Sequence, residues 1–190
     1  MPFKPLILRL MQTTLITQRL RLVPLRRPLL EAFASSRAEL SRLLAVDVPI
    51  DWPVAPELIP FVLRRLDTCP QSTEWLPWAI IDLQSVSLAG DAGFKGALDK
   101  QGCCEIGYSI IPSFRHRGYA TEAVAGIVGW ARLVSTIRSV RAETSKNNLP
   151  SQRVLEKNGF VFTGEYPHPE VGFIRRYELP IPRSNICHTV

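Results

Sequence analysis

The sequence predicts one α/β (α+β) domain built on a mixed, mostly antiparallel central sheet with helices on both faces. The chain has 190 residues, which is long enough for one domain with a substantial core and short for two. Segments that alternate polar and apolar residues are interleaved with segments whose apolar residues recur every three or four positions. Their order is a strand, helices, a run of antiparallel strands, and then helices alternating with strands. This order favours a single mixed sheet covered by helices.

Strands are expected where polar and apolar residues alternate between turn residues. The predicted strands cover 17–25, 75–82, 86–94, 104–111, 139–144, 160–164 and 172–179. Helical spacing predicts helices over 29–45, 58–67, 121–134 and 150–158. We expect an N-terminal extension at 1–16, the domain at 17–180 and a C-terminal tail at 181–190. Because Met11 precedes the first predicted strand, either Met1 or Met11 is the native start, and the first ten residues are expected to be dispensable.

Composition is that of an ordinary globular protein, with 46% hydrophobic and 21% charged residues. No apolar run approaches the roughly 20 residues that a membrane-spanning helix requires, and no secretory signal is recognisable. We therefore expect a cytoplasmic location and no membrane partner. The cysteines Cys69, Cys103, Cys104 and Cys187 lack metal-ligand spacing, so we expect reduced thiols and no metal site.

The net charge of +6 arises in the N-terminal part of the chain. Through Arg42, eight basic residues accompany two acidic ones, and the remainder is balanced. Such a segment can attract RNA, an acidic protein surface or an anionic ligand. However, Arg19 and Arg21 alternate with Leu20 and Leu22, as on the solvent face of a half-buried strand, and no aromatic residues are interleaved. A solvated face is therefore favoured over a nucleic-acid patch.

A basic, glycine-containing loop follows the predicted strand 104–111 and opens the clearest predicted helix. A helix N-terminus offers unpaired N–H groups and about half a positive charge. Gly118 and Ala120 have almost no side chain, which lets phosphate oxygens approach the backbone, and Arg115 and Arg117 add charge. These residues alone fit a pyrophosphate cradle and a plain basic turn equally well.

The pattern Arg115-x-x-Gly118-x-Ala120 resembles motif A of the GNAT superfamily of acyltransferases, R/Q-x-x-G-x-G/A, in the expected place between a strand and a helix. Longer strings resemble the branch that contains the Rim-type ribosomal-protein N-terminal acetyltransferases. They are TxRLxL at 17–22, EIGY at 105–108, RGYATEA at 117–123 and NxxSxRVLEKxGF at 148–160. The resemblance covers about residues 17 to 179, which is most of the chain.

The resemblance implies a splayed strand pair, formed by the strand that ends at Ile110 and Ile111 and by the strand at 139–144, with acetyl-CoA held between them as acyl donor. The cofactor-binding residues that it implies are Ile110, Ile111, Arg115, Arg117, Gly118, Tyr119, Ala120, Thr121, Asn148 and Ser151. Asn148 is also a candidate cap of the helix that follows it. The two roles are compatible, because a cap uses the side-chain oxygen and leaves the NH₂ group free.

The implied chemistry is attack of a neutral amine on a thioester, so an ammonium must first lose a proton. Glu105, the one carboxylate on the strand beside the thioester, is either the general base or a solvent-facing strand residue. The backbone N–H of Ile111 is the expected oxyanion donor. Many members carry a tyrosine acid where this chain has Leu155. Ser151 is therefore either the donor to the leaving sulfur or an ordinary first-turn residue, whereas Glu122 is expected to favour the helix dipole.

We therefore predict an acyl-CoA-dependent N-acetyltransferase that acetylates a primary amine by direct attack in a ternary complex. The acceptor, either a protein N-terminus or a small-molecule amine, stays open, as does formation of a homodimer. The alternative from another class is an acyl-CoA-binding sensor or interaction module without turnover, which the missing tyrosine would suit. A weaker alternative is RNA binding through the basic segment, with strong salt dependence as its signature.

Overall fold

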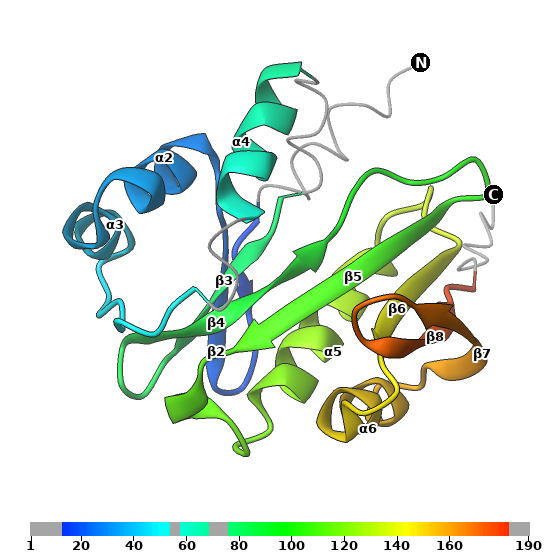
Figure 1. The fold of residues 1–190 in the computed structure, drawn as a ribbon. Helices are drawn as coiled ribbons and strands as arrows, with labels where there is room; N and C mark the ends of the chain where they lie inside the picture. Colours follow the sequence, from blue (N-terminus) through cyan, green and yellow to red (C-terminus); the bar gives the residue numbers. More distant parts are fainter. Residues whose placement is uncertain (1–12, 54–57, 69–75, 183–190) are drawn as a thin grey trace, which may run out of the picture.

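The computed structural model describes residues 13–53, 58–68 and 76–182, and within these ranges its centre is an eight-stranded sheet of order β1-β2-β3-β4-β5-β6-β8-β7 (Figure 1). The strands are β1 (Leu15–Ile16), β2 (Leu20–Pro24), β3 (Trp78–Asp82), β4 (Ser87–Phe94), β5 (Cys103–Ile110), β6 (Ser139–Ser145), β7 (Val161–His168) and β8 (Gly172–Pro180). The predictions for Cys69, Cys187 and the first ten residues lie outside the described residues.

The helices are α2 (Arg27–Ser35), α3 (Arg37–Leu44), α4 (Leu58–Thr68), α5 (Tyr119–Ala131) and α6 (Leu149–Lys157), with a short 3₁₀ turn η2 at Pro112–Phe114. The prediction of a single helix over 29–45 is wrong, because the helix is interrupted at Ser36. The backbone of Ser36 is extended, with φ −160° and ψ 127°, and its side chain accepts a hydrogen bond from the N–H of Glu39. A serine in this position ends one helix and caps the next.

The pairing of β5 with β6 is the feature of the sheet that positions the site. These two strands are parallel, whereas the other neighbouring strands are antiparallel. Their pairing runs from Cys103 opposite Ser139 to Ile106 opposite Ala142 and stops there. Both strands continue for several residues, to Ile110 and Ser145. They therefore diverge beyond Ile106, which confirms the predicted splayed pair in a mixed sheet.

The two faces of the sheet are covered by different helices, and β4 shows the division. Phe94 faces α5, where its ring lies 5.7 Å from that of Trp130. Asp91 faces the opposite side, where it accepts a hydrogen bond from the indole N–H of Trp52. Trp52 in turn packs edge-on against Phe33 of α2, with ring centroids 4.8 Å apart. Since successive strand residues point to opposite faces, α5 covers one face and α2 with the 46–53 segment covers the other.

Residues just outside the predicted bounds of 17 and 180 also make contacts with the sheet. At the start, Leu15 and Ile16 pair with Leu22 and Arg21 of β2. At the end, Ile181 is buried and its N–H donates to the carbonyl of Arg138, at 2.7 Å. These contacts satisfy backbone groups that would otherwise be left at sheet edges.

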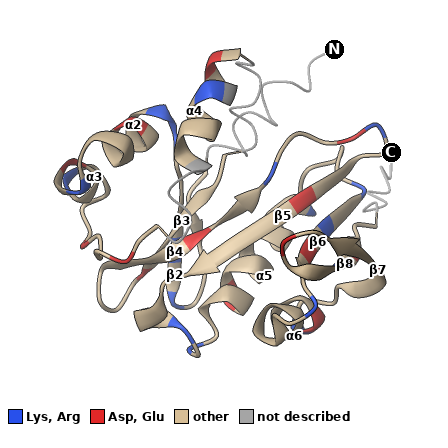
Figure 2. Cartoon of the chain, viewed as in Figure 1, with Lys and Arg blue, Asp and Glu red and all other residues tan. Residues whose placement is uncertain are grey.

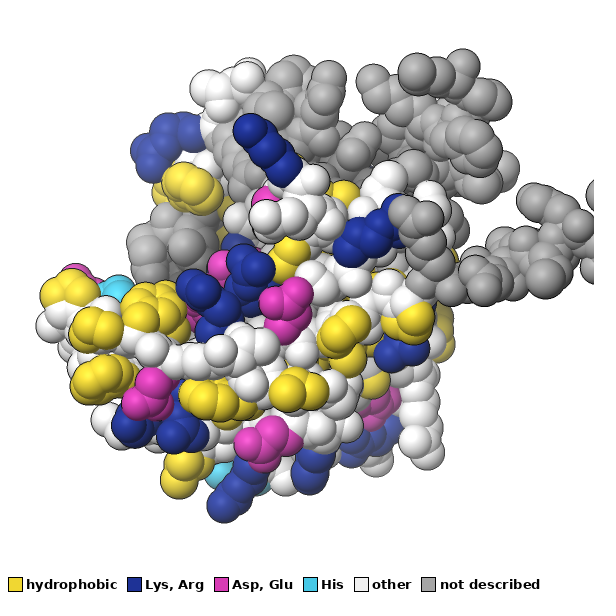
Figure 3. Space-filling view, turned by 90° about the vertical axis from the view of Figure 1, so that its right-hand side faces the viewer, with side chains coloured by type: hydrophobic (Ala, Val, Ile, Leu, Met, Phe, Trp, Pro, Cys, Tyr) yellow, Lys and Arg dark blue, Asp and Glu magenta, His cyan; other side chains and the backbone are white. Residues whose placement is uncertain are grey.

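Several basic residues of the N-terminal segment form ion pairs or hydrogen bonds within the fold. Arg27 pairs with Glu31 and Asp67, and Arg42 pairs with Glu39. Arg21 is half-buried and donates to the carbonyl of Leu44, so the solvent face that we predicted is only partly solvated. Positive and negative residues are interspersed along the chain (Figure 2) and on the face shown in Figure 3.

Two further findings concern the described residues alone. None of their helices combines the length and the apolar character needed to cross a membrane. Cys103 and Cys104 are buried, unbridged thiols, and no group of three or more His, Cys, Asp or Glu residues in this part of the chain is placed to hold a metal.

Candidate active site

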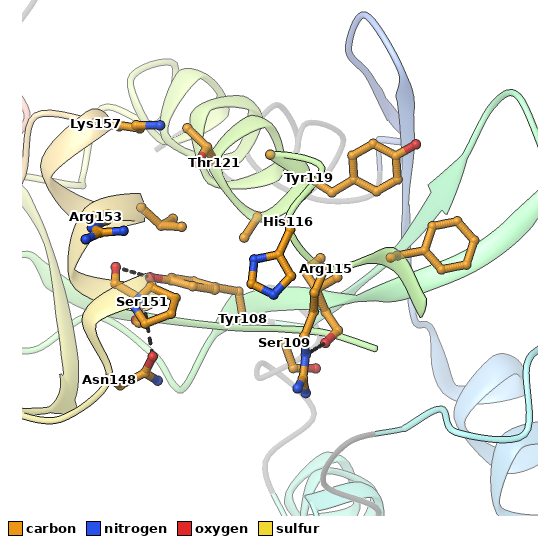
Figure 4. A pocket seen from close by; sticks show the side chains of 16 residues that line it. Tyr108, Ser109, Arg115, His116, Tyr119, Thr121, Asn148, Ser151, Arg153 and Lys157 are labelled. Atoms are coloured by element: carbon orange, nitrogen blue, oxygen red, sulfur yellow. Dashed lines mark hydrogen bonds between the residues drawn. The ribbon is translucent and has the colours of Figure 1, made fainter. Parts of the chain in front are cut away.

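The gap between β5 and β6 opens into a cleft of about 800 Å³ that is bordered by the η2–α5 loop and by the start of α6 (Figure 4). Ten residues were predicted to bind the cofactor, and all but Ile111 and Arg117 line this cleft. Ile111 is fully buried. Arg117 instead lies over the ring of Phe114, with its guanidinium carbon 5.1 Å from the ring centroid.

The N-terminus of α5 is open toward the cleft. Gly118 is its N-cap residue, with the left-handed angles φ 80° and ψ 7°, and no side chain caps the helix. Gly118, Ala120 and Thr121 all line the cleft. The first N–H groups of a helix lack intrahelical partners and carry the positive end of its dipole. The loop that the sequence predicts to bind an anion therefore has the geometry of an anion-binding site.

Arg19 holds the loop before α5 in place. Its Nε donates to Glu122, at 2.7 Å, and its Nη1 donates to the carbonyl of Arg117, at 2.9 Å. Its guanidinium also lies over the ring of Tyr119. Glu122 accepts further hydrogen bonds from the hydroxyl of Thr17 and from the N–H of Arg19. Desolvation opposes ionisation of Glu122, but these hydrogen bonds outweigh it and lower its pKa. Glu122 therefore joins the β1–β2 turn to α5.

Cations border the cleft on two sides. Arg115 is exposed, and its Nε donates to the carbonyl of Ile110, at 2.9 Å, so its side chain folds back over the end of β5. Arg153 and Lys157 are exposed residues of α6 that line the cleft one helical turn apart. Sequence reasoning gave these two no role, although their spacing within the NxxSxRVLEKxGF string places them on one helix face.

Ser151 and Tyr108 form a hydroxyl pair inside the cleft (Figure 4). Their oxygens are 2.9 Å apart, and Tyr108 also donates to the carbonyl of Ser151, at 3.1 Å. Burial raises the pKa of Tyr108 to about 12, so it keeps its proton at neutral pH. The capping prediction is confirmed, because the side-chain oxygen of Asn148 accepts from the N–H of Ser151. Sequence reasoning missed Tyr108, although it lies in the EIGY string.

The hydrogen bonds between β4 and β5 show that the expected oxyanion donor, the N–H of Ile111, is wrong. The N–H of Ile111 donates to the carbonyl of Ala89, at 3.0 Å, and is therefore not free. In an antiparallel ladder, residues bonded to the partner strand alternate with residues that point away from it. The N–H of Ile110 consequently points away from β4, toward the gap beside β6. The register that decides this cannot be read from the strand's own residues.

The structure does not bring Glu105 to the cleft. Its carboxylate pairs with Lys95, at 2.7 Å, and it lies four residues before Ser109, about 13 Å along a strand. The nearer carboxylate is Asp91 of β4, which pairs with Ser109 in the ladder and accepts from its hydroxyl, at 3.0 Å. Sequence reasoning missed Asp91 because it considered only carboxylates on β5.

Comparison with known proteins agrees with this geometry. A family model described as acetyltransferase (GNAT) domain matches residues 19–161, and the chain belongs to this family. A relative in Bacillus subtilis (strain 168), named uncharacterized N-acetyltransferase YjdG, is 31% identical over 157 residues, which cover 80% of this chain and 94% of the relative. The protein is therefore an acyl-CoA-dependent N-acetyltransferase, and its family uses acetyl-CoA as acyl donor.

Solved structures share the fold. One is RimL, ribosomal L7/L12 alpha-N-protein acetyltransferase, in complex with coenzyme A, with a TM-score of 0.62 and 17% identity over 88% of this chain and 97% of that one. Another is the ribosomal-protein-S5-alanine acetyltransferase from Vibrio fischeri, with a TM-score of 0.64 and 12% identity over 89% and 97% of the two chains.

Proposed function

We propose that the protein transfers the acetyl group of acetyl-CoA to a primary amine by direct attack in a ternary complex, with the cofactor in the gap between β5 and β6. The observation that carries the proposal is the end of the β5–β6 ladder at Ile106 and Ala142. Beyond it, backbone groups of β5 lack a partner strand beside a cleft that the α5 N-terminus and basic side chains border. An extended acyl-pantetheine chain needs such backbone partners. The diphosphate of the cofactor needs the positive end of a helix dipole, which the N-terminus of α5 supplies.

The diphosphate would lie on the backbone N–H groups of Gly118, Ala120 and Thr121, because these residues line the cleft at the uncapped helix end. Arg153 and Lys157 would contribute charge from the facing helix α6. The side-chain NH₂ of Asn148, which the helix cap leaves unused, would reach the pantetheine arm. All of these groups line one cleft.

The acyl transfer would proceed through a tetrahedral intermediate. The amine nitrogen forms a bond to the carbonyl carbon, and the carbonyl oxygen takes the electron pair and accepts a hydrogen bond from the N–H of Ile110. The C–S bond then breaks, and the electron pair leaves with the sulfur. Ser151 would donate to that sulfur, with its hydroxyl held by Tyr108, whose hydroxyl oxygen lies 2.9 Å away. This pair would serve where many relatives of this superfamily use a tyrosine at the position of the buried Leu155.

The test is to measure binding and turnover separately. Calorimetry with acetyl-CoA should show binding, and adding a panel of amines and peptides should release free CoA. A sensor without turnover would bind acetyl-CoA and release none. Arg153→Gln should weaken acetyl-CoA binding several-fold, whereas Arg132→Gln, an equal change of charge at an exposed position outside the cleft, should leave it unchanged. Equal affinities in both variants would contradict the placement of the cofactor beside α6.

A further inference from the structure

A second pocket, of about 590 Å³, adjoins the cofactor cleft. Its walls are mainly apolar and come from Trp52, from Phe61, Val62 and Leu66 of α4, and from Leu76. Its volume lies in the range of pockets that hold small molecules. Phe61 is 54% exposed, although it is a large apolar residue at the pocket. An occupant with an apolar body would cover it.

The two cavities meet at Tyr108 and Ser109, which line both of them. Ser109 is the residue before Ile110, whose N–H points into the gap where the thioester carbonyl would lie. A molecule in the second pocket would therefore approach the thioester from the side opposite to the cofactor's diphosphate. This is the position that the nucleophile of an acyl transfer must take.

One carboxylate, that of Asp91, lies at this junction. The indole N–H of Trp52 and the hydroxyl of Ser109 both donate to its Oδ2, each at 3.0 Å. Oδ1 accepts no hydrogen bond from a described residue, and the ion pairs of this part of the chain do not include Asp91. Trp52 is buried and is held by Phe33, so the carboxylate has a fixed orientation. Its second oxygen is left for a ligand.

The electrostatic surroundings of Asp91 favour a cationic partner. Desolvation raises the pKa of its carboxyl, and the hydrogen bonds from Ser109 and Trp52 only partly offset this. A carboxylate between apolar walls is costly unless a cation or hydrogen bonds compensate it. The titratable side chains that share the pocket are Lys95, which is engaged with Glu105, and Tyr108, which is engaged with Ser151. An ammonium group would supply the missing partner.

We propose that this pocket binds the acetyl acceptor, that the acceptor is a primary amine on an aromatic or branched apolar body, and that Asp91 receives its ammonium group. This inference rests on the proposed function. The ammonium transfers one proton to Oδ1 of Asp91, and the neutral nitrogen then forms the bond to the thioester carbon. As the C–S bond breaks, the thiolate takes up the second proton that the nitrogen loses, so the products are the N-acetyl amine and CoA.

The pocket suits other amine classes less well. A polyamine carries several cations, but among the described lining residues Asp91 is the only carboxylate, and Lys95 would repel a second positive charge. A peptide N-terminus brings amide groups directly behind its amine. The apolar side chains of Phe61, Val62 and Leu66 offer these amides no hydrogen bonds.

The experiment compares 2-phenylethylamine with ethanolamine and with a peptide that begins with serine, by release of CoA from the full-length enzyme. The wild type should use 2-phenylethylamine at least tenfold more efficiently, in kcat/KM, than either of the others. Asp91→Asn keeps the shape of the side chain and should lower this kcat/KM about a hundredfold at pH 7 while acetyl-CoA affinity stays within twofold. The deficit should shrink as the pH approaches the pKa of the amine, about 10 for an alkyl amine.

Two further variants distinguish the contribution of the apolar wall of the pocket from that of the Asp91 charge. Asp67→Asn makes the same change at an exposed position of α4 outside the pocket and should leave kcat/KM unchanged. Phe61→Ser removes an exposed wall residue and should raise the KM for 2-phenylethylamine about tenfold without changing that for ethanolamine. Preference for the peptide or for ethanolamine, or wild-type kinetics in both Asp91→Asn and Phe61→Ser, would overturn the inference while leaving the proposed function intact.

If acetyl-CoA binds but no amine releases CoA, the proposed function fails, and the pocket is then tested by binding alone. Calorimetry of 2-phenylethylamine on the CoA-loaded protein should show binding that Asp91→Asn abolishes and Asp67→Asn does not. Absence of binding to the wild type would overturn the pocket assignment as well.

Discussion

Gly118→Ala is the substitution whose effect the structure allows us to work out most fully. Gly118 has φ 80°, and a Cβ built there meets only the Arg19 Nη2 atom within 4 Å, at 3.5 Å. The protein itself therefore has room for the methyl group, which would stand at the edge of the cleft. The left-handed backbone costs an alanine about 1–2 kcal/mol, which lowers the melting temperature by roughly 2–8 °C in a domain of this size.

Gly172 offers a matched control for this strain. It has φ 79°, is the first residue of β8 and lies outside the cleft, and a Cβ there meets nothing within 4 Å. Gly172→Ala should therefore lose about as much stability as Gly118→Ala. Only Gly118→Ala should also weaken acetyl-CoA binding, because its methyl group would hold a phosphate away from the backbone N–H groups.

The expected loss of affinity follows from one hydrogen bond. A hydrogen bond to a charged group is worth about 1.5–3 kcal/mol, so losing one should weaken binding about tenfold or more. Calorimetry of acetyl-CoA with both folded variants, beside their thermal unfolding curves, measures the two effects separately. If Gly118→Ala binds as tightly as Gly172→Ala, the diphosphate does not lie on the α5 N-terminus and the reasoning is refuted.

Three further predictions concern single side chains. Ser151→Ala and Tyr108→Phe should each lower kcat about five- to thirtyfold with acetyl-CoA affinity nearly intact, as expected for one neutral hydrogen bond to the leaving sulfur; unchanged kcat in both would remove this pair from the mechanism. Glu105→Gln should leave the pH profile of kcat/KM at its wild-type shape, because Glu105 pairs with Lys95 away from the cleft. A loss of kcat/KM in this variant that recovers at high pH would instead identify Glu105 as the general base. The pKa of Glu122 is lowered in the folded state, so its stabilising effect is present above its ordinary pKa of 4.5 and is lost as the pH falls through the folded value. Glu122→Gln should therefore lower the melting temperature at pH 7, and the difference from wild type should shrink below about pH 4.5, whereas a constant difference would count against this linkage.

The features that could be predicted from the sequence are those that a short stretch of chain encodes. The order of strands and helices follows from the period of the apolar residues, and the open α5 N-terminus follows from the local RGYA string. Asn148 caps α6 through a contact three residues away, which is why it could be named in advance. Where a local rule failed, as at Ser36, the competing rule was also local: a serine cap interrupted an otherwise continuous helical pattern.

The sequence by itself thus determined the family, the order of the elements and the anion-binding loop, because these depend on neighbours within a few residues. Only the tertiary structure decided which side chains meet at the junction of the two cavities. Asp91 reaches Ser109 through strand pairing, and Tyr108 reaches Ser151, 43 residues away, through packing of α6 beside β5. The N–H of Ile111 is engaged because β4 lies in one particular register. Register and packing are set by burial of the whole core, since a shift of one residue would turn every side chain of a strand to the other face.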